Sequence, residues 1–95
     1  MGLIGQEVVA QALVRARRDL AQRLGVSDEE ILEAVVEPAE FSDAALGAPV
    51  ADEMSAQVIT PGWRIRLNTN DKSYEYRATD RQLRLFNFNG RNYRI

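Results

Sequence analysis

The stretch that decides the fold is residues 61–88, PGWRIRLNTNDKSYEYRATDRQLRLFNF. Large apolar and polar residues alternate along it in three runs, separated by turn-forming residues at 70–71 and 80–82. An alternation with a period of two is typical of strands that bury one face. We therefore predict an antiparallel meander with one apolar face. The residues expected on that face are Trp63, Ile65, Leu67, Tyr74, Tyr76, Ala78, Leu83 and Leu85.

A helix is expected over residues 3–24, where apolar residues recur at spacings of three and four and form one stripe that can cover the sheet. Gly25 can adopt the left-handed conformation that ends a helix in a Schellman motif. Residues 27–30, SDEE, match a capping box and predict a single helical turn, after which Ile31 and Leu32 would fill the corner. The stripe comprises Val9, Ala12, Leu13, Ala16, Leu20 and Leu24, and the polar side Arg15, Arg18, Asp19 and Gln22.

Residues 33–41, EAVVEPAEF, predict a further strand. Pro38 has no N–H to donate to a ladder, so this strand is expected at a sheet edge. Residues 42–57 are small and acidic and contain Gly47 and Pro49, which predicts a long loop. The strand is expected to place Val35, Ala39 and Phe41 on one side and Glu40 on the other.

The meander is expected over residues 58–95, bent or bulged at Pro61-Gly62. Asn89-Gly90 is the strongest hairpin signal in the chain, because both positions of a type I′ turn tolerate positive φ. It favours a last short strand over residues 91–95 that folds back on residues 84–88, and the alternative is a frayed C-terminus. Together these elements predict a single α+β domain over residues 1–95. In it, a long N-terminal helix packs on one face of a four- or five-stranded antiparallel sheet.

The composition argues against an enzyme. The chain contains no histidine and no cysteine, so the commonest general base and the thiol nucleophile are both missing. The acidic residues do not follow the spacing of a calcium loop, and no glycine-rich phosphate loop occurs. We therefore expect no catalytic residues, no cofactor and no metal site.

The expected location is the cytoplasm, without a membrane partner. No apolar run approaches the roughly 18–20 residues that span a bilayer, and no basic segment followed by an apolar one marks an export signal. The net charge of −2 gives no overall attraction to nucleic acid or anionic lipid.

The charges are unevenly distributed. Residues 1–24 hold four arginines and two acids, residues 25–61 hold nine acids and no base, and residues 62–95 hold eight bases and three acids. In one interpretation, acids such as Glu33, Glu37 and Glu40 neutralise the arginines within the fold. In the other, the arginines form an exposed basic face for an anionic partner. Complementary charge within one chain favours the first.

Four segments together resemble a family of small uncharacterised bacterial domains, free-standing or attached to lipoproteins, that carry a W-P-D-x-S-L-G-C-P loop. The segments are ARRDLAQRLGVSDEEI, FSDAALGAP, VITPGWRIRL and YEYRATD, and the resemblance covers about residues 12–88. The order of elements is also similar to PepSY-type domains, in which a helix covers a small antiparallel sheet and which are proposed to bind or restrain proteases. The resemblance implies a fold and no activity. This chain departs from the loop pattern at Phe41, Ser42, Ala45 and Ala48, where the family has Trp, Pro, Ser and Cys. The missing Cys removes the cross-link that the resemblance implies between the loop and a second cysteine near the end of the sheet.

The function expected from these features is a non-catalytic protein-binding or regulatory module, with Asp43, Leu46, Gly47 and Pro49 as partner-binding residues. Leu46 is either an exposed anchor held by the following Gly-Ala-Pro step, or it tucks under the sheet edge and caps the core. We expect a monomer whose partner is another protein.

The alternative function is nucleic-acid binding through an arginine-rich sheet face that carries aromatic side chains. Only Phe86 and Phe88 are expected to share a face with Arg84, while Trp63, Tyr74 and Tyr76 fall on the apolar face. Nucleic acid is therefore the less favoured partner.

Overall fold

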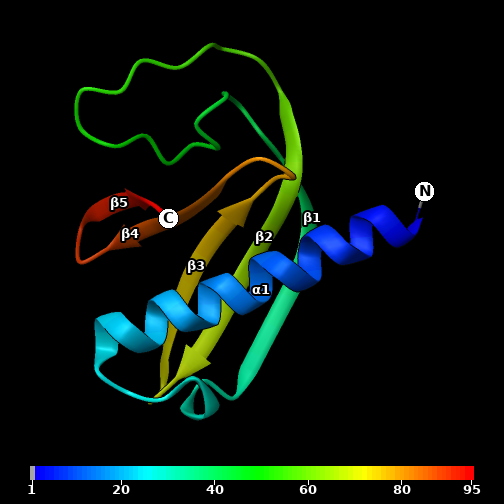
Figure 1. The fold of residues 1–95 in the computed structure, drawn as a ribbon. Coiled ribbons are helices and arrows are strands. Elements are labelled where there is room, and N and C mark those ends of the chain that lie inside the picture. Colours follow the sequence, from blue (N-terminus) through cyan, green and yellow to red (C-terminus); the bar gives the residue numbers. More distant parts are fainter. Residues whose placement is uncertain (1) are drawn as a thin grey trace.

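The computed structural model describes residues 2–95 and consists of one helix packed beside one open sheet (Figure 1). The strands follow the chain in the order β1-β2-β3-β4-β5, and each pairs antiparallel with the next. The α+β meander predicted from the sequence is thus confirmed, with five strands. The elements are α1 (Gly2–Leu24), the 3-10 turn η1 (Asp28–Glu30), β1 (Glu33–Phe41), β2 (Thr60–Thr69), β3 (Lys72–Ala78), β4 (Leu83–Phe88) and β5 (Arg91–Arg94).

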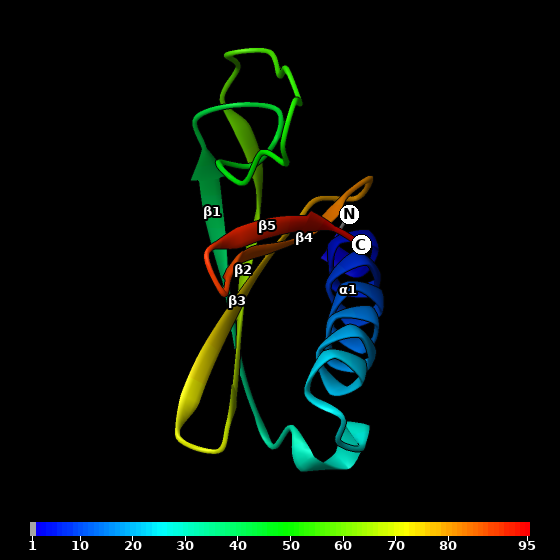
Figure 2. The same cartoon turned by 90° about the vertical axis from the view of Figure 1, so that its left-hand side faces the viewer.

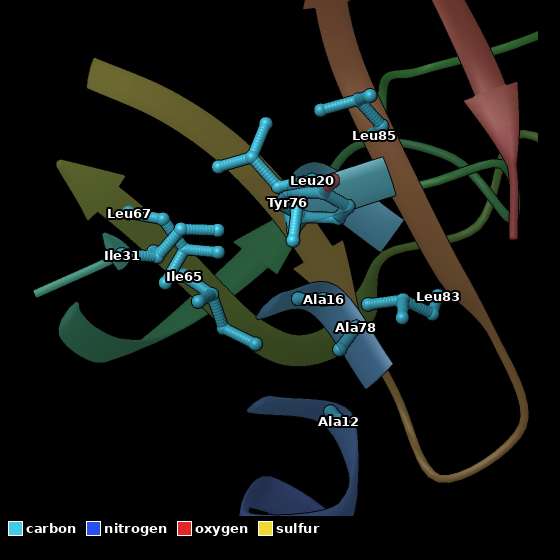
Figure 3. Packing of buried hydrophobic residues seen from close by; sticks show 11 residues of the cluster. Ala12, Ala16, Leu20, Ile31, Ile65, Leu67, Tyr76, Ala78, Leu83 and Leu85 are labelled. Atoms are coloured by element: carbon cyan, nitrogen blue, oxygen red, sulfur yellow. The ribbon is translucent and has the colours of Figure 1, made fainter. Parts of the chain in front are cut away.

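The core lies between α1 and one face of the sheet (Figure 2). The alanines of the helix face leave room for large sheet side chains, and Leu20 lies against Tyr76 in Figure 3. Trp63, expected in this core, is only partly buried and lies outside the cluster. The cluster comprises Ala12, Ala16, Leu20, Ala21, Ile31, Ile65, Leu67, Tyr76, Ala78, Leu83 and Leu85.

The helix ends in the predicted Schellman motif. Gly25 has a φ of 70°, and its N–H donates to the Gln22 carbonyl at 3.4 Å. The Val26 N–H donates to the Ala21 carbonyl at 3.0 Å. These two bonds satisfy carbonyls that the end of a helix otherwise leaves unpaired.

The single turn predicted after the helix is also present. The Ser27 N–H donates to Glu30 Oε2 at 2.9 Å, which fixes the start of η1. Ile31 then enters the core, as expected, but Leu32 is 77% exposed. The prediction that both residues fill the corner was wrong for Leu32, because the chain becomes extended there and successive side chains point to opposite sides.

Asp19 is not on the solvent side of α1, where the helical period placed it. The Tyr76 hydroxyl donates to Asp19 Oδ2 at 2.7 Å, and Arg23 Nε donates to the same oxygen at 2.8 Å. Burial and the Asp19 carboxylate raise the pKa of Tyr76 well above its ordinary value, so the phenol remains a hydrogen-bond donor. The Arg23 guanidinium also lies 4.1 Å from the centre of the Tyr93 ring.

Strand β1 is an edge strand, as its proline predicted. Val35, Ala39 and Phe41 share one side, but this side faces away from the helix. Ala34 and Val36, on the other side, are the residues that pack on the core.

Strand β2 begins at Thr60, two residues later than the expected start of the meander. The strand has no bulge at Pro61-Gly62, since the pairing with β1 continues through both residues without a shift in register. Gly62 is needed for another reason: a Cβ atom there would lie 2.2 Å from the carbonyl oxygen of Ala78.

The irregularity in the sheet lies instead between Leu85 and Phe88, where the pairing of β4 with β5 shifts. Asn87 adopts a positive φ of 53° at this point. The shift turns Phe88 towards the helix side, where it packs on Tyr74 and Tyr93. The expectation that Phe88 shares a face with Arg84 was therefore wrong.

The last hairpin forms as predicted. Asn89 and Gly90 have φ angles of 53° and 84°, as a type I′ turn requires, and β5 pairs back on β4.

Candidate functional site

A row of arginines crosses the face of the sheet opposite the helix. Neighbouring strands place the residues of the row opposite one another, in the order Glu37, Arg64, Arg77, Arg84 and Arg94 from β1 to β5. Like charges that lie directly opposite each other destabilise a sheet unless other groups compensate them. The groups around this row therefore decide what the face can bind.

Glutamates neutralise the half of the row near β1. Arg64 lies 3.2 Å from Glu75 Oε2 and 3.4 Å from Glu37 Oε1. Arg66, two residues along β2, makes longer contacts with the same two glutamates at 3.6 and 3.9 Å. The interpretation that acids neutralise arginines within the fold is confirmed for Glu37, whereas Glu40 is exposed and forms no salt bridge in the described part of the chain. The side chain of Glu33, named in the same interpretation, lies outside the described residues.

Arg77, in the middle of the row, is enclosed by the loop and by aromatic rings. Its Nε lies 2.8 Å from Glu75 Oε2, and its Nη1 donates to the Leu46 carbonyl at 2.9 Å. The guanidinium lies 3.8 Å from the centre of the Phe86 ring and 5.4 Å from that of Phe41. A cation over an aromatic face is attracted by the ring quadrupole, which stabilises this charge without exposing it.

Arg84 is 4% exposed and forms a bidentate ion pair with Glu53 of the loop. Its Nη1 and Nη2 donate to Glu53 Oε1 and Oε2 at 2.5 and 2.7 Å, and Nη1 also donates to the Ala48 carbonyl at 3.2 Å. The hydrogen bonds from Arg84 lower the pKa of Glu53 to about 2, so this carboxylate is charged under all physiological conditions.

Side chains of the sheet fix the first half of the long loop. Gln82 Nε2 donates to the Ala44 carbonyl at 2.8 Å, and Asn92 Nδ2 donates to the Pro49 carbonyl at 2.9 Å. With Arg77 and Arg84, these side chains hold carbonyl groups all along residues 44–49. The loop stands at one end of the sheet, next to β4 and β5 (Figures 1 and 2). It is thus an ordered part of the domain, a property that its composition did not indicate.

The predicted partner-binding residues mostly shape the loop itself. Asp43 Oδ1 accepts the N–H groups of Ala45 and Gly47 at 2.9 and 3.0 Å. Gly47 has a φ of 64°, and a Cβ there would lie 2.8 Å from Nη1 of Arg77. Leu46 is fully buried, so the exposed-anchor alternative is wrong. Its burial is as the other alternative expected, but it lies outside the core cluster and does not cap it. Pro49 is exposed.

The second half of the loop carries three large apolar side chains that are exposed to solvent. Met54 is 96% exposed, Ile59 72% and Val58 53%. We call residues 54–59 the outer limb of the loop. Elsewhere, the large exposed apolar residues of the described chain are single ones: Val14, Leu32 and Val35.

Among the side chains that the structure describes, no group of three acidic, histidine or cysteine residues is placed to hold a metal ion. No helix in the described residues is both long enough and apolar enough to cross a membrane. The site therefore consists of a sheet face with paired charges, a fixed loop and an exposed apolar limb.

The chain was compared with models of protein families, and one model matches it. The model of a family described as a domain of unknown function, DUF8738, matches residues 13–86, which include α1 from Leu13 onwards, the loop and most of the sheet. A comparison with curated proteins finds no match, and neither does a comparison with solved structures.

Proposed function

Because the chain belongs to the DUF8738 family, a domain of unknown function, we propose its role from its own surface: it is a non-catalytic module that binds another protein through the outer limb of the loop. The observation that carries this proposal is the exposure of Met54, Val58 and Ile59 within six consecutive residues.

Large exposed apolar side chains this close together in the chain can form the apolar patch that marks an interaction surface. Burying one large apolar side chain contributes about 1.5–3 kcal/mol, so the three together are sufficient for a specific contact. A partner protein with an apolar groove is the matching occupant, since the limb, MSAQVI, carries no charge.

The fixed first half of the loop supports the same proposal. Glu53, which immediately precedes the limb, is held by two hydrogen bonds from the buried Arg84, and Thr60, which follows the limb, begins β2. Both ends of the limb are therefore anchored to the sheet. Anchoring reduces the conformational entropy that binding must remove, which favours affinity. On this proposal Asp43, Leu46 and Gly47 contribute by shaping the loop, and the exposed Pro49 lies at the margin of the contact.

The arginine face supports nucleic-acid binding less well. Its central charges are already paired with Glu75 and Glu53, and Phe86 lies under the Arg77 guanidinium. A base would have to displace these contacts before it could stack. The layout of a helix on a small antiparallel sheet is similar to that of PepSY-type domains, which agrees with a binding or regulatory role. We propose that the protein acts in the cytoplasm.

The test begins with a photo-crosslinking amino acid at Met54, and at Val14 as a control in a second preparation. Val14 is a matched control because it is apolar and 53% exposed but lies on α1. A protein captured from the source cells only at position 54 is then purified, and its Kd is measured by calorimetry.

The double variant Met54→Ser/Ile59→Ser is expected to raise this Kd about tenfold or more, and Val14→Ser to leave it within about twofold. Equal affinities of all three chains would refute the proposal. So would a wild-type dimer that the double variant converts to a monomer in light scattering, because the limb would then contact a second copy.

A further inference from the structure

Four arginines line one hollow on the surface, and three of them are exposed: Arg15, Arg81 and Arg94. Arg15 comes from α1, Arg81 from the turn between β3 and β4, and Arg94 from the end of β5. Figure 2 shows the end of β5 beside α1, which brings these elements together. The hollow has a volume of about 80 Å³, and we call it the arginine pocket. Its other lining residues are Gln82, Leu83, Arg84 and Ile95.

The positive charge of the arginine pocket is largely unmatched. Among the side chains that the structure describes, Arg81 forms no salt bridge, and Arg15 pairs with no acidic side chain. Arg94 reaches only Glu53, at 4.0 Å, and that carboxylate already makes a shorter bidentate pair with Arg84. A locally basic surface thus exists on a chain whose net charge is −2.

The backbone around the pocket is held in place. Arg15 Nη2 donates to the main-chain oxygen of Ile95 at 3.1 Å, and the Ile95 N–H donates to the Leu83 carbonyl at 2.9 Å. The Arg81 N–H donates to Thr79 Oγ1 at 3.1 Å, which fixes the turn that carries this arginine. Guanidinium groups on fixed elements bind an anion with a smaller loss of entropy than mobile ones do.

We propose that the arginine pocket binds the carboxylates of an acidic peptide segment in a partner protein. Guanidinium groups match carboxylates with paired hydrogen bonds, and Leu83 and Ile95 supply an apolar wall for the methylene groups of glutamate side chains. Nucleic acid is a poorer occupant, because the pocket has no aromatic lining on which a base could stack. This site is separate from the outer limb of the loop.

The test uses a fluorescein-labelled peptide with four consecutive glutamates, and a glutamine peptide of the same length as its control. Binding is followed by fluorescence anisotropy at two salt concentrations. Arg81→Gln and Arg94→Gln are each expected to weaken binding about fivefold or more. Arg18→Gln removes the same charge from an exposed position on α1 outside the pocket and is expected to change the affinity less than about twofold. Thermal unfolding of each variant verifies that the fold is kept.

The proposal would be overturned if the wild type showed no saturable binding of the glutamate peptide. It would also be overturned if Arg18→Gln and Arg81→Gln weakened the affinity equally. Tighter binding of an oligothymidine of equal charge would overturn it as well, because the pocket would then serve nucleic acid. The variant Met54→Ser/Ile59→Ser is expected to bind the glutamate peptide like the wild type, so failure of one site is distinguishable from failure of the other.

Discussion

Replacing Glu53 by Gln is expected to destabilise the whole domain, although Glu53 lies in a loop. Its carboxylate is the counter-charge of Arg84, whose side chain is 5% exposed. Removal of one partner of a buried ion pair costs about 3–5 kcal/mol, because the other charge stays buried and uncompensated. The Glu53 side chain is 16% exposed, and a glutamine oxygen can still accept one hydrogen bond. We therefore expect a loss of about 2–3 kcal/mol in the free energy of unfolding.

The assay is urea unfolding at neutral pH, with the slope of the transition used to verify that both chains unfold in one step. In a parallel thermal unfolding experiment, the melting temperature is expected to fall by about 8–24 °C, at about 4–8 °C per kcal/mol for a domain of this size. Glu40→Gln is the control, because this exposed acid of β1 forms no salt bridge in the described residues, and it should change stability by less than about 0.5 kcal/mol. If Glu53→Gln is as stable as Glu40→Gln, the ion pair does not hold the loop.

The same ion pair predicts a pH dependence. Arg84 lowers the pKa of Glu53 from 4.5 to about 2, so the stability that the pair contributes is complete above pH 4.5. It is lost progressively as the pH falls from about 4.5 to about 2. The difference in stability between wild type and Glu53→Gln should therefore shrink over this range, and parallel pH profiles would contradict the assignment.

Three further substitutions test the packing of the helix and the sheet. Leu20→Ala removes a fully buried side chain and should cost about 2–5 kcal/mol, and an unchanged melting temperature would place the helix stripe on the surface. Gly62→Ala puts a methyl group 2.2 Å from the Ala78 carbonyl oxygen and should cost about 1–3 kcal/mol in urea unfolding, whereas a neutral effect would show that β2 and β3 are not so close. Tyr76→Phe removes the hydrogen bond to Asp19 and should cost about 1–2 kcal/mol by thermal unfolding, and a fully stable variant would rule out this bond.

The spacing of apolar residues was sufficient to predict the helix, the strands and the apolar face. The helical period and the strand period each reflect which side chains contact the core. It failed where a tertiary contact or an irregularity overrides the period. The shift after Leu85 turned Phe88 to the other face, and the hydroxyl of Tyr76 drew Asp19 towards the sheet. Neither effect leaves a signal in the neighbouring residues.

The arrangement of the site could be predicted from the sequence less well than the fold. The arginine row depends on the register of all five strands, and a slip of one residue would have moved each arginine to the other face. Glu53 is one of nine acids in its segment, and only the folded loop brings it to Arg84. Asp43 and Gly47 were predicted to bind a partner, and this stays a prediction. The structure shows that both residues shape the loop, a role that the sequence could not distinguish from a binding role.

Met54 offers the most direct test of the proposed contact surface. Its side chain is 96% exposed, so hydrogen peroxide should oxidise it readily in the free protein. The measurement is the oxidation rate of Met54, followed by mass spectrometry, in the free chain and in a saturated complex with the partner captured at position 54. Contact through the outer limb predicts a clear slowing of oxidation in the complex. An unchanged rate at saturation would show that the partner binds elsewhere.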